Sequence, residues 1–259
     1  MDYLTLKKQV LNKYFSRTND MQKKAVFRIN GAVLIVAGAG SGKTTVLCNR
    51  IANMLLFGNA YNSNTVRELS DDDVAFAQSF LAGKIDNFDA AERLSEIFGE
   101  DRVKPWNILA VTFTNKAAKE MRERVEKLVG DTARDMWIST FHSTCVRILR
   151  REIQHLDYEN QFSIYDSDDQ EKIMREAFKR LNMSTTDKSF SVKGAMSIIS
   201  HLKEEMTSWE DYAQHVDKND LKAVRIAKVY QTYQKMLKEN NALDFDDLIV
   251  KTIELFQNC

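Results

Sequence analysis

Hydrophobic and polar positions change their spacing several times along the chain. Residues 32–36 are five consecutive apolar positions, and such a run predicts a strand buried on both faces of a parallel sheet. Three glycines follow within five positions, and from Thr44 onward the apolar residues recur with a helical period. The runs 108–111 and 137–139 predict two more short strands, each followed by a helical pattern. Strands that alternate with helices indicate an α/β protein.

The second part of the chain, from about residue 155, has an almost wholly helical pattern. Asp244 can cap a last helix, because its carboxylate can accept hydrogen bonds from the first turn. Before it, helices are expected at residues 191–206, 208–216 and 218–240. We therefore expect an all-helical part in addition to a parallel sheet with helices on both faces.

The segment 60–104 differs in composition from its surroundings. It contains ten acidic and five basic residues, a net charge of −5, and it lies between Gly58 and Pro105. Acidic side chains are seldom buried, and this charge would repel a phosphate backbone. We therefore expect an acidic surface insertion.

The composition as a whole narrows the class of protein. Hydrophobic residues make up 44% and charged residues 29%, as in soluble globular proteins, and no apolar run is long enough for a membrane span. No secretory signal pattern occurs, and the three cysteines lack metal-ligand spacing. A cytoplasmic protein without membrane contact is expected. Since the formal net charge is zero, a nucleic-acid-binding surface must be local.

The glycine-rich turn after residues 32–36 carries the strongest chemical signal. Strand, glycine-rich turn, Lys43-Thr44 and helix together predict a phosphate-binding loop. Glycines allow backbone N–H groups to face a phosphate, and the helix N-terminus favours negative charge. Lys43 would contact the β- and γ-phosphates, and the Thr44 hydroxyl would bind Mg²⁺. The candidate nucleotide-contacting residues here are Gly38, Ala39, Gly40, Ser41, Gly42, Lys43, Thr44 and Thr45.

A glutamine upstream of this loop is a candidate for base recognition. Gln22 precedes the first apolar run, in a segment that Thr18 or Asn19 can cap as a helix. A carboxamide can pair with the N6 and N7 edge of adenine. The predicted cofactor is therefore ATP with Mg²⁺.

Two junctions between predicted strands and helices share the order strand, Thr-Phe, polar residue, helix. An aromatic ring beside hydroxyls and a helix N-terminus suits one nucleotide of a single strand. The stretch 113–155 is also locally positive, with nine basic and six acidic residues. The alternative is that both phenylalanines are core residues. The candidate DNA-binding residues are Phe113, Thr114, Asn115, Thr140, Phe141 and His142.

Taken together, these residues resemble the superfamily 1 DNA helicases of the UvrD/Rep/PcrA type. Gln22 resembles the adenine-reading glutamine of the family, residues 37–44 its first helicase motif, residues 112–118 and 140–143 its single-strand-contacting motifs, and residues 243–248 a further stretch. Thr45 stands where many relatives carry an arginine.

The resemblance implies a RecA-like P-loop NTPase fold and a domain organisation. Residues 1–150 would form motor domain 1A, residues 151–240 helical subdomain 1B, and residues 241–259 would return to 1A, ending before the Asp-Glu pair of the second motif. The second motor domain would be supplied by a longer parent.

The resemblance also implies a function for that parent. It would be an ATP-dependent helicase acting in DNA repair and moving along single-stranded DNA, whereas this chain alone is expected to be inactive. The alternatives are a subunit of a helicase–nuclease, a non-catalytic nucleic-acid-binding module with a relict nucleotide site, and a small-molecule P-loop kinase.

Overall fold

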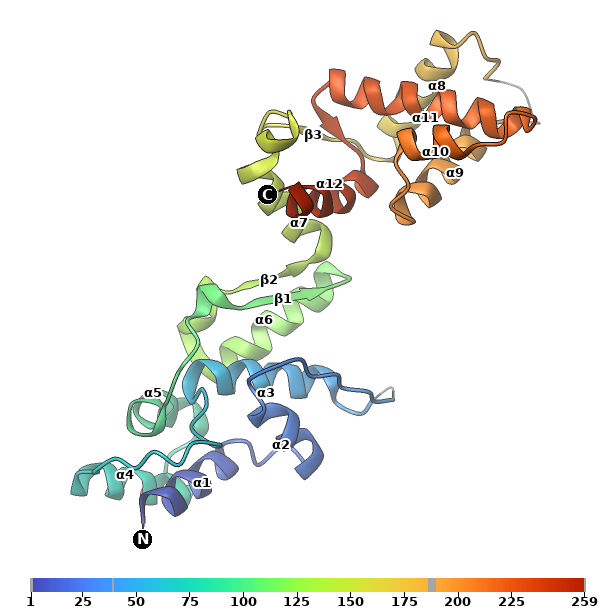
Figure 1. Cartoon of the computed structure of the whole chain (residues 1–259). Coiled ribbons are helices and arrows are strands. Elements are labelled where there is room, and N and C mark those ends of the chain that lie inside the picture. Colours follow the sequence, from blue (N-terminus) through green and yellow to red (C-terminus); the bar gives the residue numbers. More distant parts are fainter. Residues whose placement is uncertain (1, 39, 186–189, 259) are drawn as a thin grey trace. The chain divides into compact units, whose positions relative to one another are not determined.

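The computed structural model describes residues 2–38, 40–185 and 190–258, so Ala39 of the phosphate-binding loop lies outside the described residues. The chain divides into two compact units, Met1–Thr140 (unit 1) and Phe141–Cys259 (unit 2). Each unit is described by itself, with the element labels of Figure 1.

Unit 1 is mostly helical, and side-chain caps mark where several of its helices begin. The Asn19 side chain accepts from the backbone N–H of Gln22, and Ser70 and Asp86 cap two later helices in the same way. The elements are α1 (Tyr3–Tyr14), α2 (Asp20–Phe27), α3 (Lys43–Leu56), α4 (Asp71–Leu81), α5 (Asn87–Phe98), η1 (Pro105–Asn107), β1 (Leu109–Thr112), α6 (Asn115–Val129), η2 (Gly130–Asp135) and β2 (Trp137–Thr140).

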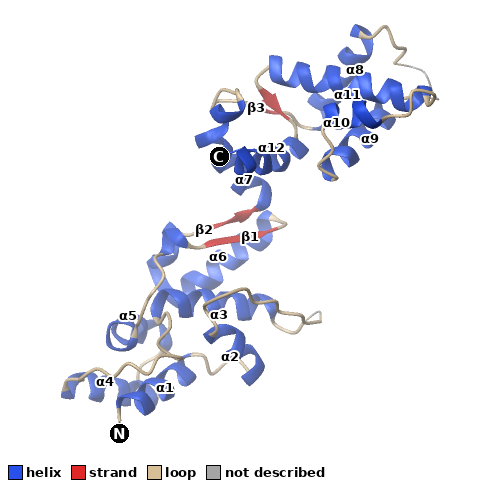
Figure 2. Cartoon of the chain, in the orientation of Figure 1, coloured by secondary structure: helices blue, strands red, loops and turns tan. Residues whose placement is uncertain are grey.

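The only sheet described in unit 1 is the parallel pair β1–β2, whose register sets Thr112 opposite Thr140 (Figure 2). Parallel strands run in the same direction, so both carboxyl ends lie at one edge of the pair. Thr112 and Thr140, which end β1 and β2, therefore lie at the same end of the pair.

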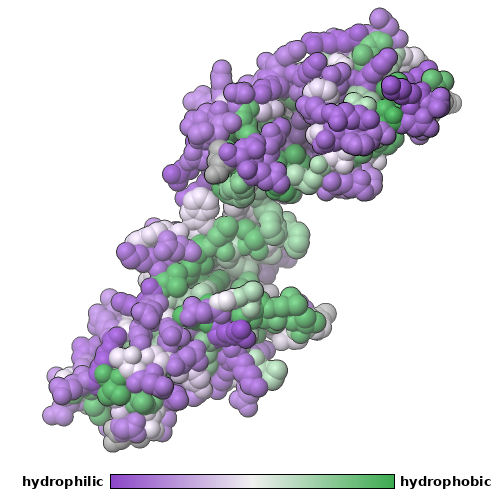
Figure 3. Space-filling view, viewed as in Figure 1, coloured by the Kyte–Doolittle hydropathy of each residue, from purple (hydrophilic) through white to green (hydrophobic). Residues whose placement is uncertain are grey.

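The expectation of a buried strand at residues 32–36 is wrong for the described structure. This stretch is extended but pairs with no described strand, and the side chains of Leu34 and Val36 are 89% and 85% exposed. In Figure 3 it is part of a hydrophobic surface on unit 1. An apolar run becomes a buried strand only where neighbouring strands satisfy its backbone, and here β1 and β2 pair with each other instead.

The expectation that residues 60–104 lie at the surface is also wrong, because α4 and α5 contribute to the core. Phe80, Leu94 and Phe98 are at most 1% exposed and belong to the same hydrophobic cluster as α1. The ring of Phe80 lies 6.2 Å from that of Tyr14. The acidic residues occupy the outward side of amphipathic helices, so a net charge summed over the segment did not reveal its buried face.

Unit 2 is a helical assembly with one short parallel strand pair, β3–β4. The expected helices at 191–206, 208–216 and 218–240 are confirmed as α9, α10 and α11, with slightly shorter bounds. The elements are α7 (Phe141–Glu152), η3 (Ile153–Leu156), β3 (Ser163–Ile164), α8 (Ser167–Arg180), α9 (Val192–Glu204), α10 (Trp209–His215), α11 (Leu221–Glu239), β4 (Ala242–Leu243) and α12 (Phe245–Asn258).

Two clusters form the interior of unit 2. One packs α8, α9 and α11 together, with Phe178 stacked on Phe190 at 5.4 Å. The other joins α7, η3 and α12 through buried residues that include Leu149 and Leu248. Helix α12 therefore packs against α7 and α9.

Candidate nucleotide and nucleic-acid sites

The phosphate-binding loop has the backbone that its glycines were expected to allow. Gly40 and Gly42 have φ of +74° and +81°, in the left-handed region that favours glycine. Gly42 is also the N-cap of α3, and no side chain caps this helix. The first N–H groups of α3 are therefore open at the loop, as an anion-binding helix terminus requires.

Lys43 and Ser41 bind carbonyl groups of their own loop. Lys43 Nζ donates to the carbonyl oxygens of Ala37 and Gly38, each at 2.7 Å, and Ser41 Oγ donates to Gly38 O at 2.7 Å. Hydrogen bonds from an ammonium to a charged phosphate are stronger than those to a neutral carbonyl. The ammonium is thus held at the loop, and a phosphate group can replace the two carbonyl groups as its partner.

Gln22 is joined directly to this loop. Its Nε2 donates to Ser41 O at 3.1 Å, and its Oε1 accepts from the backbone N–H of Asn19 at 3.0 Å. A carboxamide has two donor hydrogens and two acceptor lone pairs, so one of each remains for a base edge. Gln22 also lines a hollow of about 420 Å³ with Ser41, Lys43 and the extended residues 33–37.

Helix α2 is fixed against α3 from below the loop. Arg50 of α3 donates to Ala25 O at 2.7 Å and to Ile29 O at 3.3 Å, and Asn53 donates to Val26 O at 3.2 Å. These side chains satisfy carbonyls at and beyond the end of α2. They keep Gln22 in register with the phosphate-binding loop.

The first Thr-Phe junction lies in unit 1, and its aromatic ring is not a core residue. Phe113 is 89% exposed and follows β1 directly. Thr114 caps α6 by accepting from the N–H of Ala117 at 3.1 Å, and Asn115 is the first residue of that helix. A solvent-facing ring therefore stands beside a helix N-terminus.

The second junction leads into α7 of unit 2, where the ring of His142 stacks on that of Phe245 from α12. Thr140 is buried at the end of β2, and the next residue, Phe141, is 41% exposed. The His142 ring stacks on Phe245, with 4.1 Å between ring centroids and 29° between planes. Phe245 itself is 52% exposed. Both rings thus form a partly open aromatic surface.

Phe245 was missed as a candidate, although the sequence held a signal for it. Leu243 ends β4, Asp244 caps the next helix through the N–H of Asp247 at 2.8 Å, and Phe245 begins α12. The order strand, polar residue, phenylalanine, helix is close to that of the two Thr-Phe junctions. Its acidic neighbours fit a helix cap, so the sequence pattern favoured a capping role for this stretch over an exposed aromatic ring.

The described part of the chain contains neither a cluster of metal-ligating side chains nor a membrane-spanning helix. No group of three or more His, Cys, Asp or Glu side chains could hold a metal ion there. Among the described helices, none has both the length and the apolar character needed to cross a membrane.

Comparisons with known proteins show the family to which the chain belongs. The model of the UvrD/REP helicase N-terminal domain family matches residues 18–66 and 90–259. A protein of Staphylococcus epidermidis named ATP-dependent DNA helicase PcrA is 39% identical over 247 residues, and one of Staphylococcus aureus with the same name is 38% identical. The match covers 95% of this chain and 27% of each relative.

The stretches on either side of the unmatched residues 67–89 contain Gln22, the phosphate-binding loop and both Thr-Phe junctions. The match to a helicase family argues against the alternative that the chain is a small-molecule P-loop kinase. Because the family model matches more than half of the chain, the chain belongs to the UvrD/REP helicases and corresponds to their N-terminal domain.

Proposed function

We propose that this chain is the ATP- and single-stranded-DNA-binding part of an ATP-dependent DNA helicase that acts in DNA repair. The single observation that carries the proposal is the phosphate-binding loop with Gln22 bonded to it. The parent would couple ATP hydrolysis to movement along one strand and to duplex unwinding. In this proposal residues 1–150 form domain 1A with a RecA-like fold, residues 151–240 subdomain 1B, and residues 241–259 return to 1A.

The residues of the loop fit a Mg²⁺–nucleotide. A Cβ placed on Gly38 or Gly40 would meet no atom within 4 Å, so the backbone is open to a close ligand. Lys43 would hold the β- and γ-phosphates, and Thr44, exposed in the first turn of α3, would be a ligand of Mg²⁺. When bound, the metal neutralises charge on the phosphates.

The proposed single-strand site uses exposed rings at helix starts. In unit 1, Phe113 would stack a base, while Thr114 and Asn115 offer polar groups to a phosphate. In unit 2, the His142–Phe245 pair and Phe141 offer a second aromatic surface. Stacking on an aromatic ring contributes about 1–3 kcal/mol per base and tolerates any sequence.

Titration with a fluorescent ATP analogue in Mg²⁺ tests the nucleotide site. Lys43→Ala should weaken binding at least tenfold, since it removes the charge that contacts the phosphates. Lys8→Ala, an exposed lysine of α1 outside the loop, is the matched control and should bind as the unaltered chain does. Tight binding by Lys43→Ala would overturn the proposed role of the loop.

Fluorescence anisotropy with labelled oligothymidine tests the strand site. Phe113→Ala and Phe245→Ala should each weaken binding at least about fivefold and leave ATP affinity unchanged. Phe256→Ala is the control, because this ring is 66% exposed on the same helix as Phe245 but far along it from the junction. Equal affinities of all three variants, or a preference for duplex, would contradict a stacking role.

A further inference from the structure

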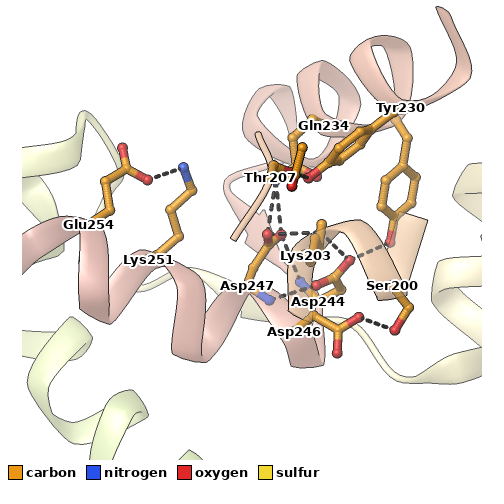
Figure 4. A network of polar contacts seen from close by, with 11 residues as sticks. Ser200, Lys203, Thr207, Tyr230, Gln234, Asp244, Asp246, Asp247, Lys251 and Glu254 are labelled. Carbon is orange, nitrogen blue, oxygen red and sulfur yellow. Dashed lines mark hydrogen bonds and ion pairs between the residues drawn. The ribbon is translucent and has the colours of Figure 1, made fainter. Parts of the chain in front are cut away.

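A cluster of charged side chains is buried inside unit 2. Lys203 of α9 is 2% exposed, and Asp244 and Asp247 at the start of α12 are 3% and 1% exposed. Lys203 Nζ lies 2.6 Å from Asp244 Oδ2 and 2.8 Å from Asp247 Oδ1. Figure 4 shows this one ammonium between the two carboxylates.

Helix α11 completes the cluster. Tyr233 OH donates to Asp244 Oδ2 at 2.9 Å, and Gln234 Nε2 donates to both carboxylate oxygens of Asp247, at 3.0 and 3.2 Å. Both buried carboxylates are therefore held by α9 and α11 together. On the outer side of the cluster, Asp246 accepts from Ser200 Oγ of α9 at 2.7 Å.

The electrostatics favour the charged forms of Lys203 and Asp244 and oppose ionisation of Asp247. Burial opposes the charge of Lys203, but Asp247 and Asp244 outweigh it and raise the pKa of the ammonium above its ordinary value. Burial likewise opposes ionisation of Asp244, yet Lys203 and the hydrogen bonds around it hold the pKa of this carboxyl below its usual range. Burial raises the pKa of Asp247.

A buried ion pair is a poor way to gain stability alone. Replacing such a pair by apolar side chains of similar volume is often neutral or stabilising, because the desolvation of two charges offsets their attraction. The cluster does fix an orientation, since each hydrogen bond constrains an angle as well as a distance. The element whose orientation it fixes is the first turn of α12.

Phe245 lies in this first turn, between Asp244 and Asp246. Its neighbours on both sides are bonded to α9 or α11, while its own side chain is 52% exposed. The backbone at Phe245 is thus held from the interior, and the ring is left to face His142 at 4.1 Å. A rotation of the first turn would carry the ring away from His142.

We propose that Lys203 is a positioning residue for single-strand binding: through Asp244 and Asp247 it fixes the start of α12, so that Phe245 and His142 form one preassembled surface for a base. This inference rests on the proposed function and adds to it a role for α9 and α11, which need not touch the strand. A ring that is already in place loses less freedom when a base stacks on it.

The test is a double-mutant cycle in the complete chain, measured with oligothymidine that carries one 2-aminopurine. Lys203→Met/Asp247→Asn removes the ammonium together with the carboxyl group that lies 2.8 Å from it. It is combined with Phe245→Ala. The matched control is Lys172→Met/Asp169→Asn, which removes an ion pair of 3.0 Å on the exposed side of α8.

Phe245→Ala alone is expected to weaken binding roughly 5- to 100-fold, the range of one lost base stack. Lys203→Met/Asp247→Asn should weaken it about 3- to 10-fold and reduce the quenching of 2-aminopurine, and this loss should disappear in the Phe245→Ala background. Two effects that act through one ring are not additive. The Lys172→Met/Asp169→Asn control should change neither reading.

Two other results would overturn the positioning role. One is additive losses in the cycle, which mean that the cluster acts elsewhere. The other is unchanged affinity and quenching in Lys203→Met/Asp247→Asn although Phe245→Ala weakens binding. If Phe245→Ala itself has no effect while Phe113→Ala does, the failure lies in the proposed site at Phe245 instead.

Tyr233→Phe provides a second route if the double variant does not fold. It removes one hydroxyl from Asp244 and no charge. We expect about a twofold loss of affinity that again vanishes in the Phe245→Ala background, at a temperature where circular dichroism shows both proteins folded. An equal loss in both backgrounds would overturn the proposal.

Discussion

Gly42 illustrates how much one residue can determine in this chain. It has φ of +81°, caps α3, and would carry its Cβ to within 3.1 Å of Gln22 Nε2. A side chain at this position therefore meets two obstacles, the left-handed backbone and the glutamine.

Replacing Gly42 by alanine should lower the free energy of unfolding by about 1–2 kcal/mol, the cost of a left-handed residue with a Cβ. Urea unfolding followed by circular dichroism measures it. Gly38→Ala is the control for stability, because its φ is not positive and its Cβ would meet nothing within 4 Å. Equal losses for both variants would contradict this explanation.

Gln22 should determine which base is bound. Adenine offers a donor at N6, whereas guanine offers an acceptor at O6, so the glutamine would lose a hydrogen bond with GTP. We expect ATP to bind more tightly than GTP by about 1–3 kcal/mol. Gln22→Ala should bring the two affinities together in competition titrations. Equal affinities in the unaltered chain would remove the role assigned to Gln22.

Lys203 should make the stability of unit 2 depend on alkaline pH. Its pKa in the folded chain lies above 10.5, the ordinary value, because Asp247 and Asp244 outweigh burial. The folded chain keeps the proton after the unfolded chain has lost it. The stabilisation is therefore fully present below pH 10.5 and is lost as the pH rises through the folded pKa.

Comparing urea unfolding of the unaltered chain with Lys203→Met/Asp247→Asn between about pH 10 and 12 isolates this contribution. Tyrosines outside the cluster titrate in both proteins and cancel in the difference, whereas Tyr158, Tyr230 and Tyr233, whose pKa values depend on Lys203 or Asp247, contribute to it. The unaltered chain should lose stability more steeply, and parallel pH profiles would argue against the charged pair.

At the scale of elements, helices α4 and α5 show why the charge of a segment does not decide its burial. Ten acidic residues made the segment 60–104 look external, yet its apolar side chains close the core of unit 1 against α1 and α3. Gly58 makes a parallel bridge with Glu100, which ties the two ends of the segment together.

Phe80→Ala is expected to destabilise unit 1 by about 3–5 kcal/mol, since the ring is fully buried and leaves a cavity. Phe88→Ala, a ring that is 59% exposed in the same segment, should cost about 0.5 kcal/mol or less. Thermal unfolding of both variants measures the difference. Similar melting temperatures would restore the view of a dispensable insertion.

At the scale of the whole molecule, the chain spans 27% of the length of the helicases it matches. Phosphoryl transfer needs a phosphate cradle, a metal held from two sides, an oriented water and neutralised transition-state charge. Unit 1 offers the cradle. The late acids Asp244, Asp246 and Asp247 are bonded to Lys203, Ser200 and Gln234 in unit 2, and no group of three or more His, Cys, Asp or Glu side chains among the described residues could hold a metal ion.

We therefore expect the 259-residue chain to bind ATP but to hydrolyse it far below the 1 s⁻¹ or more that is usual for enzymes. An arginine finger alone accounts for about 10³- to 10⁵-fold in related chemistry. A phosphate-release assay decides, with Lys43→Ala to reveal contaminating ATPase. Turnover near 1 s⁻¹ that is lost in this variant would show that the catalytic site is complete.

The sequence by itself determined what depends on neighbours along the chain. The turn of the phosphate-binding loop and the caps at Asn19 and Asp244 involve residues at most a few positions apart, and each was found where it was expected. Local hydrogen bonds need no knowledge of the fold. The resemblance to the helicase family rested on the same short motifs, and the family match confirms it.

Only the tertiary structure decided what depends on distant partners. Lys203 and Asp244 are 41 residues apart in the sequence. The stacked rings of His142 and Phe245 belong to α7 and α12, the first and the last helix of unit 2 in the sequence. The burial of Phe80 and the exposure of Leu34 likewise depended on which surfaces found a partner. Burial of an apolar side chain away from water is favourable, and the sequence shows which side chains are apolar. Whether such a side chain is buried depends on the strands and helices that the fold packs beside it.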